Sequence, residues 1–83
     1  MSPRQIPKLL GKKLRAIRDY KGWSMDQMAD AVGRKISSRR TRVYEWEQGI
    51  RQPDLNALLA YAKIIGISTD VLIDDNVELI LPK

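Results

Sequence analysis

The chain has 83 residues, with 15 lysines and arginines against 10 aspartates and glutamates, a formal net charge of +5, and neither cysteine nor histidine. A chain of this length is expected to form one small domain, residues 1–83, around one modest core. Without cysteine there is no disulfide framework or thiol nucleophile, and without histidine the commonest general base and metal ligand are missing. The composition therefore disfavours most enzyme classes, and no catalytic residue, metal or cofactor is expected.

Hydrophobic runs are short throughout the sequence. The longest uninterrupted apolar run, residues 57–62, is six residues long, whereas about 20 are needed to cross a bilayer. The first five residues do not resemble the start of a secretory signal. The chain is therefore expected to be soluble and intracellular.

Charge is distributed unevenly along the chain. Residues 1–51 carry 13 basic and 5 acidic side chains, a net of +8, whereas residues 52–83 carry 2 basic and 5 acidic side chains, a net of −3. A basic front half is typical of a domain that meets a polyanion, with nucleic acid or an anionic membrane surface as the candidates. The alternative is a soluble domain that merely has a basic surface.

Glycine marks the ends of the predicted helices. The first helix is expected ahead of Gly22, because its leucines and isoleucine recur with the spacing of one helix face: Leu10, Leu14 and Ile17. The basic residues of this segment are assigned to its other sides: Lys8, Lys12, Lys13 and Arg15. Gly11 lies inside the helix at a cost of about 1 kcal/mol relative to alanine. Either it permits a close backbone approach, or it is tolerated near a frayed start.

The second predicted helix begins after Ser24. Ser24 can cap it, and Gln27, three residues on, can reach back to the Ser24 amide as in a capping box. Asp26 places a negative charge near the positive end of the helix dipole. Three residues then form a short inner face before Gly33 ends the helix: Met28, Ala29 and Val32.

The third predicted helix lies within residues 34–48 (RKISSRRTRVYEWEQ). Val43 and Trp46 are three residues apart and are expected to face the core together. This orientation sends a polar stripe to the opposite side of the helix, with Arg40 and Arg42 flanking it. The stripe consists of Thr41, Tyr44, Glu45 and Gln48.

A polar stripe of this composition suits the groove of a nucleic-acid duplex. Arginine offers a bidentate fork to guanine or phosphate, and the other side chains can meet base edges or backbone oxygens. Ser37 or Ser38 is expected to cap the helix, whose start then carries three arginines. The alternative is a solvated charged helix preceded by a basic loop.

The fourth predicted helix follows Pro53, which disfavours helical geometry for the residue before it and leaves Asp54 as the expected cap. Its apolar stripe is the densest of the chain: Leu55, Leu58, Leu59, Ala62 and Ile65. A fifth, short helix is expected to begin at Ser68. The tail of residues 77–81 (VELIL) has the composition of a strand. Because a lone strand is unstable, it is expected to lie on the core or to pair with a second copy.

The order of these residues resembles the phage-repressor and Cro type of helix-turn-helix domain, often called the Xre family. The resemblance covers residues 9–73 and rests on a combination of anchors: Arg18, residues 22–29 (GWSMDQMA), Gly33, residues 43–49 (VYEWEQG), residues 52–55 (QPDL) and residues 64–72 (IIGISTDVL). It implies an all-α, compact five-helix lambda-repressor-like helix-turn-helix core. By its composition, the part that follows, residues 74–83, is expected to be a short extended tail. That tail is a candidate dimerisation strand.

The resemblance also implies a function. Proteins of this type bind operator DNA as dimers and regulate transcription, often as repressors, with the third helix in the major groove. The expected protein is therefore a cytoplasmic, nucleoid-associated regulator of bacterial or phage origin that forms a homodimer on double-stranded DNA. No small-molecule ligand is expected.

Two departures from the family pattern affect the site. The first residue after the cap of the second helix is often a glutamine that grips phosphate, but here it is Met25, so Ser24, Gln27 or nearby lysines would have to replace that contact. The connection between Gly33 and Glu47 is also longer than usual. Either the turn is enlarged or the third helix begins a turn early.

Thirteen residues are expected to contact DNA: Ser24, Gln27, Arg34, Lys35, Ser38, Arg39, Arg40, Thr41, Arg42, Tyr44, Glu45, Gln48 and Arg51. The resemblance assigns Arg18 and Glu47 to a structural ion pair between the first and third helices. Glu47 adjoins Trp46 on the inward edge and would need such a partner to be tolerated there.

Other functions stay open at this stage. A protein-interaction module of the same fold, such as an antitoxin or bridging factor, is the main alternative, because an acidic partner would be drawn to the same basic face. An enzyme is disfavoured: Asp74 and Asp75 are adjacent carboxylates that point in different directions, and they are better interpreted as a solvated helix end. Membrane-surface binding by the first helix lacks a strong aromatic face.

Overall fold

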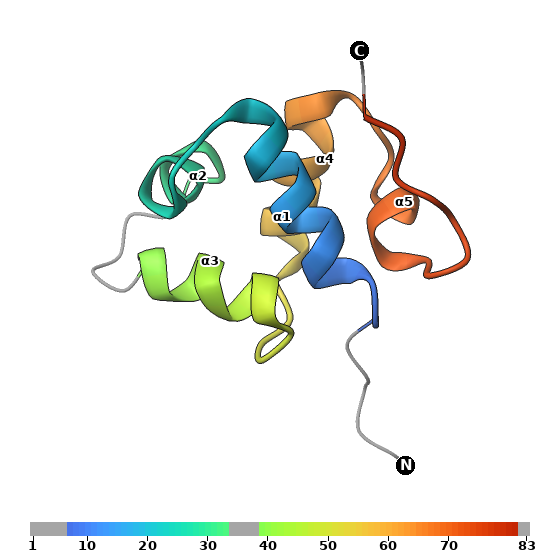
Figure 1. Cartoon of the computed structure of the whole chain (residues 1–83). Helices are drawn as coiled ribbons and strands as arrows, with labels where there is room; N and C mark the ends of the chain where they lie inside the picture. Colours follow the sequence, from blue (N-terminus) through green and yellow to red (C-terminus); the bar gives the residue numbers. More distant parts are fainter. Residues whose placement is uncertain (1–6, 34–38, 82–83) are drawn as a thin grey trace.

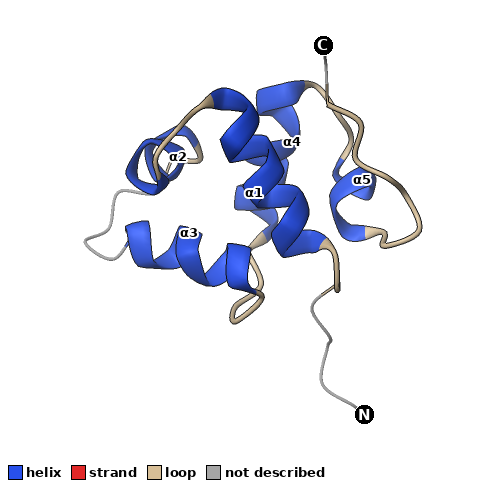
Figure 2. Ribbon diagram, viewed as in Figure 1, coloured by secondary structure: helices blue, strands red, loops and turns tan. Residues whose placement is uncertain are grey.

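The computed structural model describes residues 7–33 and 39–81. Within these ranges lie α1 (Leu10–Lys21), α2 (Met25–Ala31), α3 (Arg39–Gln48), α4 (Leu55–Ile65) and α5 (Thr69–Ile73). This described part contains no strand (Figure 2). In Figure 1, α1 runs through the middle, with α2 and α3 on one side of it and α5 on the other. The predicted all-α, five-helix fold is confirmed.

The core forms where the inner faces of all five helices meet. Leu10, Leu14 and Ile17 of α1 are completely buried, as the spacing predicted. Val43 and Trp46 of α3 are also buried. The remaining buried apolar residues come from α2, α4 and α5: Met28, Ala29, Ala57, Leu58, Tyr61, Ala62 and Leu72. Burial of these apolar surfaces is the main driving force for folding.

The helix ends follow the predicted capping chemistry. At the start of α2, Ser24 Oγ accepts a hydrogen bond from the Gln27 amide at 3.1 Å, and Gln27 Oε1 accepts one from the Ser24 amide at 2.8 Å. This reciprocal pair is the predicted capping box. Asp54 caps α4 by accepting from the amide of Ala57 at 2.8 Å. Gly22 closes α1 in the left-handed conformation, with φ of 70°.

Lys13 corrects the sequence prediction that the basic residues of α1 all face outward. Its side chain is buried, and its ammonium group donates to the carbonyls of Val71 at 2.7 Å, Asp74 at 2.9 Å and Val77 at 2.7 Å. These three acceptors use all three hydrogens of the ammonium group. Lys13 therefore joins α1 to the end of α5 and to the chain that follows it.

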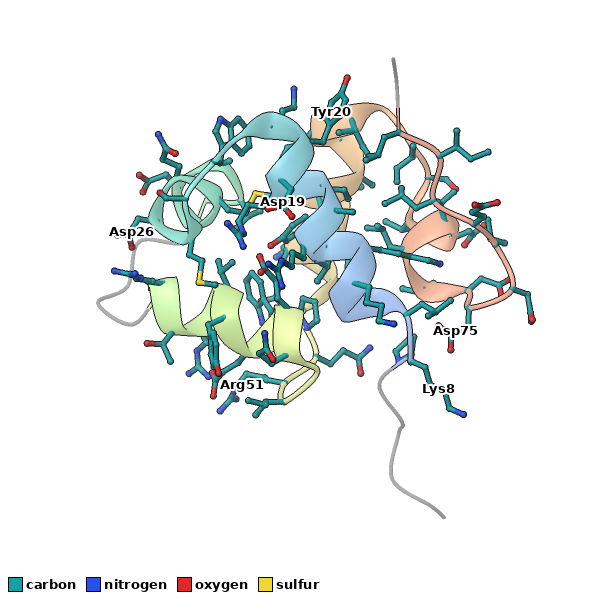
Figure 3. The ribbon with its side chains drawn as sticks, viewed as in Figure 1. Lys8, Asp19, Tyr20, Asp26, Arg51 and Asp75 are labelled. Carbon is teal, nitrogen blue, oxygen red and sulfur yellow. The ribbon has the colours of Figure 1, made fainter. Side chains whose placement is uncertain are left out.

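Asp75 is likewise more than a solvated helix end. Although exposed, its carboxylate accepts hydrogen bonds from the amides of Lys8 and Leu9, at 2.9 and 3.0 Å, just before α1 begins. Figure 3 shows Asp75 beside Lys8. The amide of Leu9, followed by that of Lys8, lowers the pKa of Asp75. Its contribution to stability is therefore present above the pKa that Asp75 has in the unfolded chain, and is lost as acid protonates the folded carboxylate.

The apolar stripe of α4 is placed differently from the sequence prediction. Leu58 and Ala62 are buried as expected, but Leu55 is 79% exposed and Leu59 is 45% exposed. Tyr61 faces the core instead. In this orientation of α4 the Tyr61 ring packs edge-to-face with Trp46, with 6.2 Å between the ring centroids. The prediction identified the helix correctly but not the direction in which it is turned.

The described tail lies along the core without forming a strand. Residues 77–81 have no regular secondary structure. Leu79 and Leu81 pack against the core as half-buried side chains, whereas Ile80 between them is 76% exposed. Within the described residues, no helix is long and apolar enough to span a bilayer.

At Gly11 the backbone of α1 lies close to the backbone of α3. A Cβ atom at this position would lie 3.0 Å from the carbonyl carbon of Glu47 and 3.1 Å from the carbonyl oxygen of Trp46. Because these are backbone atoms, they cannot rotate away from an added methyl group. Of the two roles considered for Gly11, the structure supports close backbone approach.

We expect the substitution Gly11→Ala to lower the free energy of unfolding by about 1–2 kcal/mol, because overpacking against α3 outweighs the better helix propensity of alanine. Urea unfolding followed by circular dichroism measures this difference. Lys12→Ala, at the exposed neighbouring position, is the matched control and should change stability by less than about 0.5 kcal/mol. A Gly11→Ala protein as stable as the parent would contradict the close packing.

Candidate nucleic-acid interface

The candidate interface is built on α3, which is held firmly from beneath. Val43 is fully buried and Trp46 is 2% exposed. Trp46 meets Tyr61 of α4 in an edge-to-face contact. Packing of this kind fixes the rotation of α3 about its axis, because any rotation would expose the indole ring to water. The outward face of α3 therefore has one defined orientation.

That outward face carries the polar stripe predicted from the sequence. Arg40, Thr41 and Gln48 are exposed, and Tyr44 is 47% exposed. Figure 1 shows α3 at the margin of the molecule, with its outer side uncovered by any other described helix. Hydrogen-bonding groups thus line the accessible side of a helix whose other side is anchored in the core.

Glu45 shares this region but lies between two arginines. Its Oε1 atom is 3.5 Å from Nη1 of Arg42 and 3.4 Å from Nε of Arg51. The Glu45 side chain is only 21% exposed, compared with 54% for Arg51. Figure 3 shows Arg51 just beyond the end of α3. The two cations offset a carboxylate that would otherwise repel a polyanion at short range.

The start of α2 adjoins the outward face of α3. Met25, the first residue of α2, lines a shallow hollow of about 310 Å³ together with Arg40, Thr41 and Tyr44 of α3. Ser24, just before Met25, is exposed, as is Gln27. The side chains of Ser24 and Gln27 cap α2, but each keeps a hydrogen-bond donor, the hydroxyl or the amide NH₂ group. The two helices therefore present polar side chains on both sides of this hollow.

Four of the predicted contact residues have side chains that the structure does not describe. Arg34, Lys35 and Ser38, with the alternative cap Ser37, fall outside the described residues, and Arg39 begins α3 without a described side chain. The two alternatives for this segment, an enlarged turn or an early start of the third helix, both concern residues 34–38 and lie outside the described residues.

Arg18 and Glu47 form the ion pair that the family resemblance implies. Nε of Arg18 donates to Oε2 of Glu47 at 2.6 Å, and Nη2 donates to Oε1 at 3.0 Å. Nη1 of Arg18 also donates to the carbonyl of Trp23 at 3.1 Å. Only 1% of the Glu47 side chain and 14% of the Arg18 side chain are exposed. This bidentate pair joins α1 to α3 on the side away from the polar stripe.

The charge of the pair also affects its surroundings. The hydrogen bonds with Glu47 raise the pKa of Arg18, so the guanidinium stays protonated. Burial, and then the Glu47 carboxylate, raise the pKa of Tyr61. Tyr61 is therefore a neutral phenol at any physiological pH. Its hydroxyl has no hydrogen-bond partner among the described residues, so its role there is apolar packing.

Sequence reasoning did not assign a function to Met25 and treated it only as a departure from the family pattern. The structure places it at the junction of α2 and α3, half-buried against the core. No local sequence signal marks this position, because the hollow depends on how the two helices pack. The described residues also contain no group of three or more acidic side chains positioned to hold a metal ion.

Comparison with known proteins identifies the class. Residues 14–72 match the sequence model of the helix-turn-helix family, which is more than half of the chain. The chain therefore belongs to the Xre-type helix-turn-helix family, a family of DNA-binding transcription regulators.

One relative carries the comparison further. The chain is 35% identical over 65 residues to the SPbeta prophage-derived uncharacterized HTH-type transcriptional regulator YonR of Bacillus subtilis (strain 168). The matching region covers 78% of this chain and 56% of YonR, so the chain spans little more than half the length of that relative. No solved structure matches the chain significantly.

We expect the substitution Arg18→Met to lower the free energy of unfolding by about 3 kcal/mol, because it leaves the Glu47 carboxylate buried without a charged partner. Thermal and urea unfolding measure the loss. The double variant Arg18→Met/Glu47→Leu should recover most of it, since no uncompensated charge then remains. If both variants lost equal stability, the pair would not be the reason for the effect of the single substitution.

Proposed function

We propose that this protein is a sequence-specific regulator of transcription that binds double-stranded DNA, reads the major groove with α3 and acts as a homodimer. Membership of the helix-turn-helix family supports the DNA-binding class. One structural observation carries the finer proposal. The Arg40, Thr41 and Tyr44 face of α3 is open to solvent, whereas Val43 and Trp46 anchor its underside.

The proposed contacts are of two kinds: contacts to phosphate that position the protein on the duplex, and contacts to base edges that read the sequence. Ser24 and Gln27 at the start of α2, with Arg51 beyond the end of α3, are suited to phosphate oxygens and would fix the register on the duplex. Arg40, Thr41 and Gln48 are suited to base edges in the major groove, which displays a distinct pattern for each base pair. Glu45 can accept from cytosine N4 while its two arginine neighbours limit its repulsion of phosphate.

We propose repression as the mode of regulation. A protein that occupies an operator excludes other proteins from the same DNA, so repression needs no surface beyond the one that binds. A regulator of this kind works where the genome lies, and we accordingly propose the cytoplasm, at the nucleoid, as its location.

Replacement of the two arginines that flank the polar stripe of α3, Arg40→Ala/Arg42→Ala, should weaken binding to the preferred duplex at least 100-fold at about 0.1 M salt and make the slope of log K against log salt shallower by about 1–2. The preferred duplex is selected from a random pool, and binding is measured by fluorescence anisotropy at several salt concentrations. Circular dichroism verifies that the variant is folded.

The matched control is Lys12→Ala/Lys63→Ala, which removes the same charge from exposed positions on α1 and α4. It should retain most of the affinity and all of the sequence preference. If the arginine variant bound the selected duplex as the parent does, α3 would not be the recognition helix. If the random pool yielded no consensus, sequence-specific binding itself would be refuted.

The geometry of DNA supports the proposed homodimer. Two recognition helices must lie about 34 Å apart to reach successive major grooves, whereas one copy, with principal extents of 33 × 33 × 18 Å, supplies a single α3. Exposed apolar side chains are available to a second copy on α4 and α5: Leu55, Leu59 and Ile73. Leu55 and Ile73 line a hollow of about 530 Å³, and we propose this surface as the dimer contact.

The substitution Leu55→Glu should shift the protein from dimer to monomer, because it places a charge within an apolar contact. Sedimentation equilibrium measures the change, and we expect the dimer dissociation constant to rise at least 10-fold. Ile80→Glu is the control, because Ile80 is equally exposed but belongs to the tail. Dissociation by Ile80→Glu and not by Leu55→Glu would transfer the contact to residues 77–81.

A further inference from the structure

The hollow between α2 and α3 has a mixed lining. Met25 contributes a thioether, Thr41 a methyl group and a hydroxyl, Tyr44 an aromatic ring and a hydroxyl, and Arg40 a guanidinium group. Met25 is half-buried and packs against the core, so part of its side chain is held in place while the rest is accessible. The apolar groups of Met25 on α2 and of Thr41 and Tyr44 on α3 meet in this hollow. The hollow is therefore a partly apolar recess in a face that is otherwise polar.

The chemistry of Met25 excludes one occupant. A methionine side chain has no hydrogen-bond donor and only a weak acceptor, so it cannot hold a phosphate group as a polar side chain at this position would. A phosphate placed against the thioether would lose hydration without gaining a hydrogen bond. The occupant of the recess must therefore be apolar where it meets Met25.

Double-stranded DNA offers one apolar group at the depth of the major groove, the C5-methyl group of thymine. The recess adjoins Arg40 and Thr41, which are exposed on the same outward face of α3. A thymine methyl group seated against Met25 and the Tyr44 ring would leave these two side chains free to bond to neighbouring base edges. The softness of the thioether would let it adapt to the methyl group.

We propose that the recess formed by Met25, Thr41 and Tyr44 binds the C5-methyl group of one thymine in each half-site, and that Met25 is a specificity-determining residue. This inference rests on the proposed binding of duplex DNA. Through Met25 the protein would prefer thymine because of a contact with its methyl group and not because of a hydrogen bond.

Deoxyuridine tests the inference directly, because it differs from thymidine only by the missing methyl group. Each thymine of the selected duplex is replaced by deoxyuridine in turn, and the dissociation constant is measured by anisotropy. At one thymine per half-site the replacement should weaken binding by the parent protein about fourfold, the value of one buried methyl group. Met25→Ala and Met25→Gln should reduce that ratio to about one.

Two controls separate the possible outcomes. Gln48→Ala alters the same helix outside the recess and should keep the fourfold ratio at that thymine. Met25→Gln preserves the length of the side chain, so a result shared with Met25→Ala cannot come from loss of bulk alone. Duplex binding with no methyl-sensitive thymine, or with a methyl effect unchanged in both Met25 variants, overturns this inference and leaves the proposed function intact. Failure to bind any duplex overturns both.

Discussion

The contact on which the molecule depends is the junction of α1 and α3. Gly11 allows the two backbones to approach within the space of a missing methyl group, and the Arg18–Glu47 pair joins the same helices by two hydrogen bonds. The close backbone contact at Gly11 sets the distance between α1 and α3, whereas the ion pair resists sliding and rotation of one helix against the other. Because Glu47 adjoins Trp46, the charged pair and the buried ring act on one turn of α3. The polar face on the other side of that turn is thereby held in one orientation in the free protein.

Preorganisation of this kind affects binding as well as folding. In the binding mode proposed above, α3 is already fixed in rotation and would lose little conformational entropy on entering a groove, so more of its contact energy would contribute to affinity. The Glu45 carboxylate is preorganised in the same way. Arg42 and Arg51 already flank it, so a negative side chain can remain on the surface that we propose for DNA without preventing the approach of the duplex.

Local patterns predicted local structure well, and long-range packing explains what they missed. Capping at Ser24 and Asp54 was predictable, because it involves residues three apart. The ion pair at Glu47 came from family resemblance, since no spacing rule connects residues 29 positions apart. Burial of Lys13 could not be predicted, because its acceptors are backbone carbonyls with no sequence signature. Leu55 was assigned inward because hydrophobicity alone does not fix the rotation of α4.

The hydrogen bonds of Lys13 and Asp75 have a consequence for where this domain can be cut. The family match ends at residue 72, yet two of the three Lys13 acceptors, Asp74 and Val77, and the Asp75 carboxylate that binds two amides just ahead of α1 come later in the chain. A fragment trimmed to the matched boundary would leave the buried Lys13 ammonium group with one of its three acceptors, and the amides of Lys8 and Leu9 without theirs. The hydrogen bonds that hold α1 thus reach at least five residues beyond the family match, to Val77.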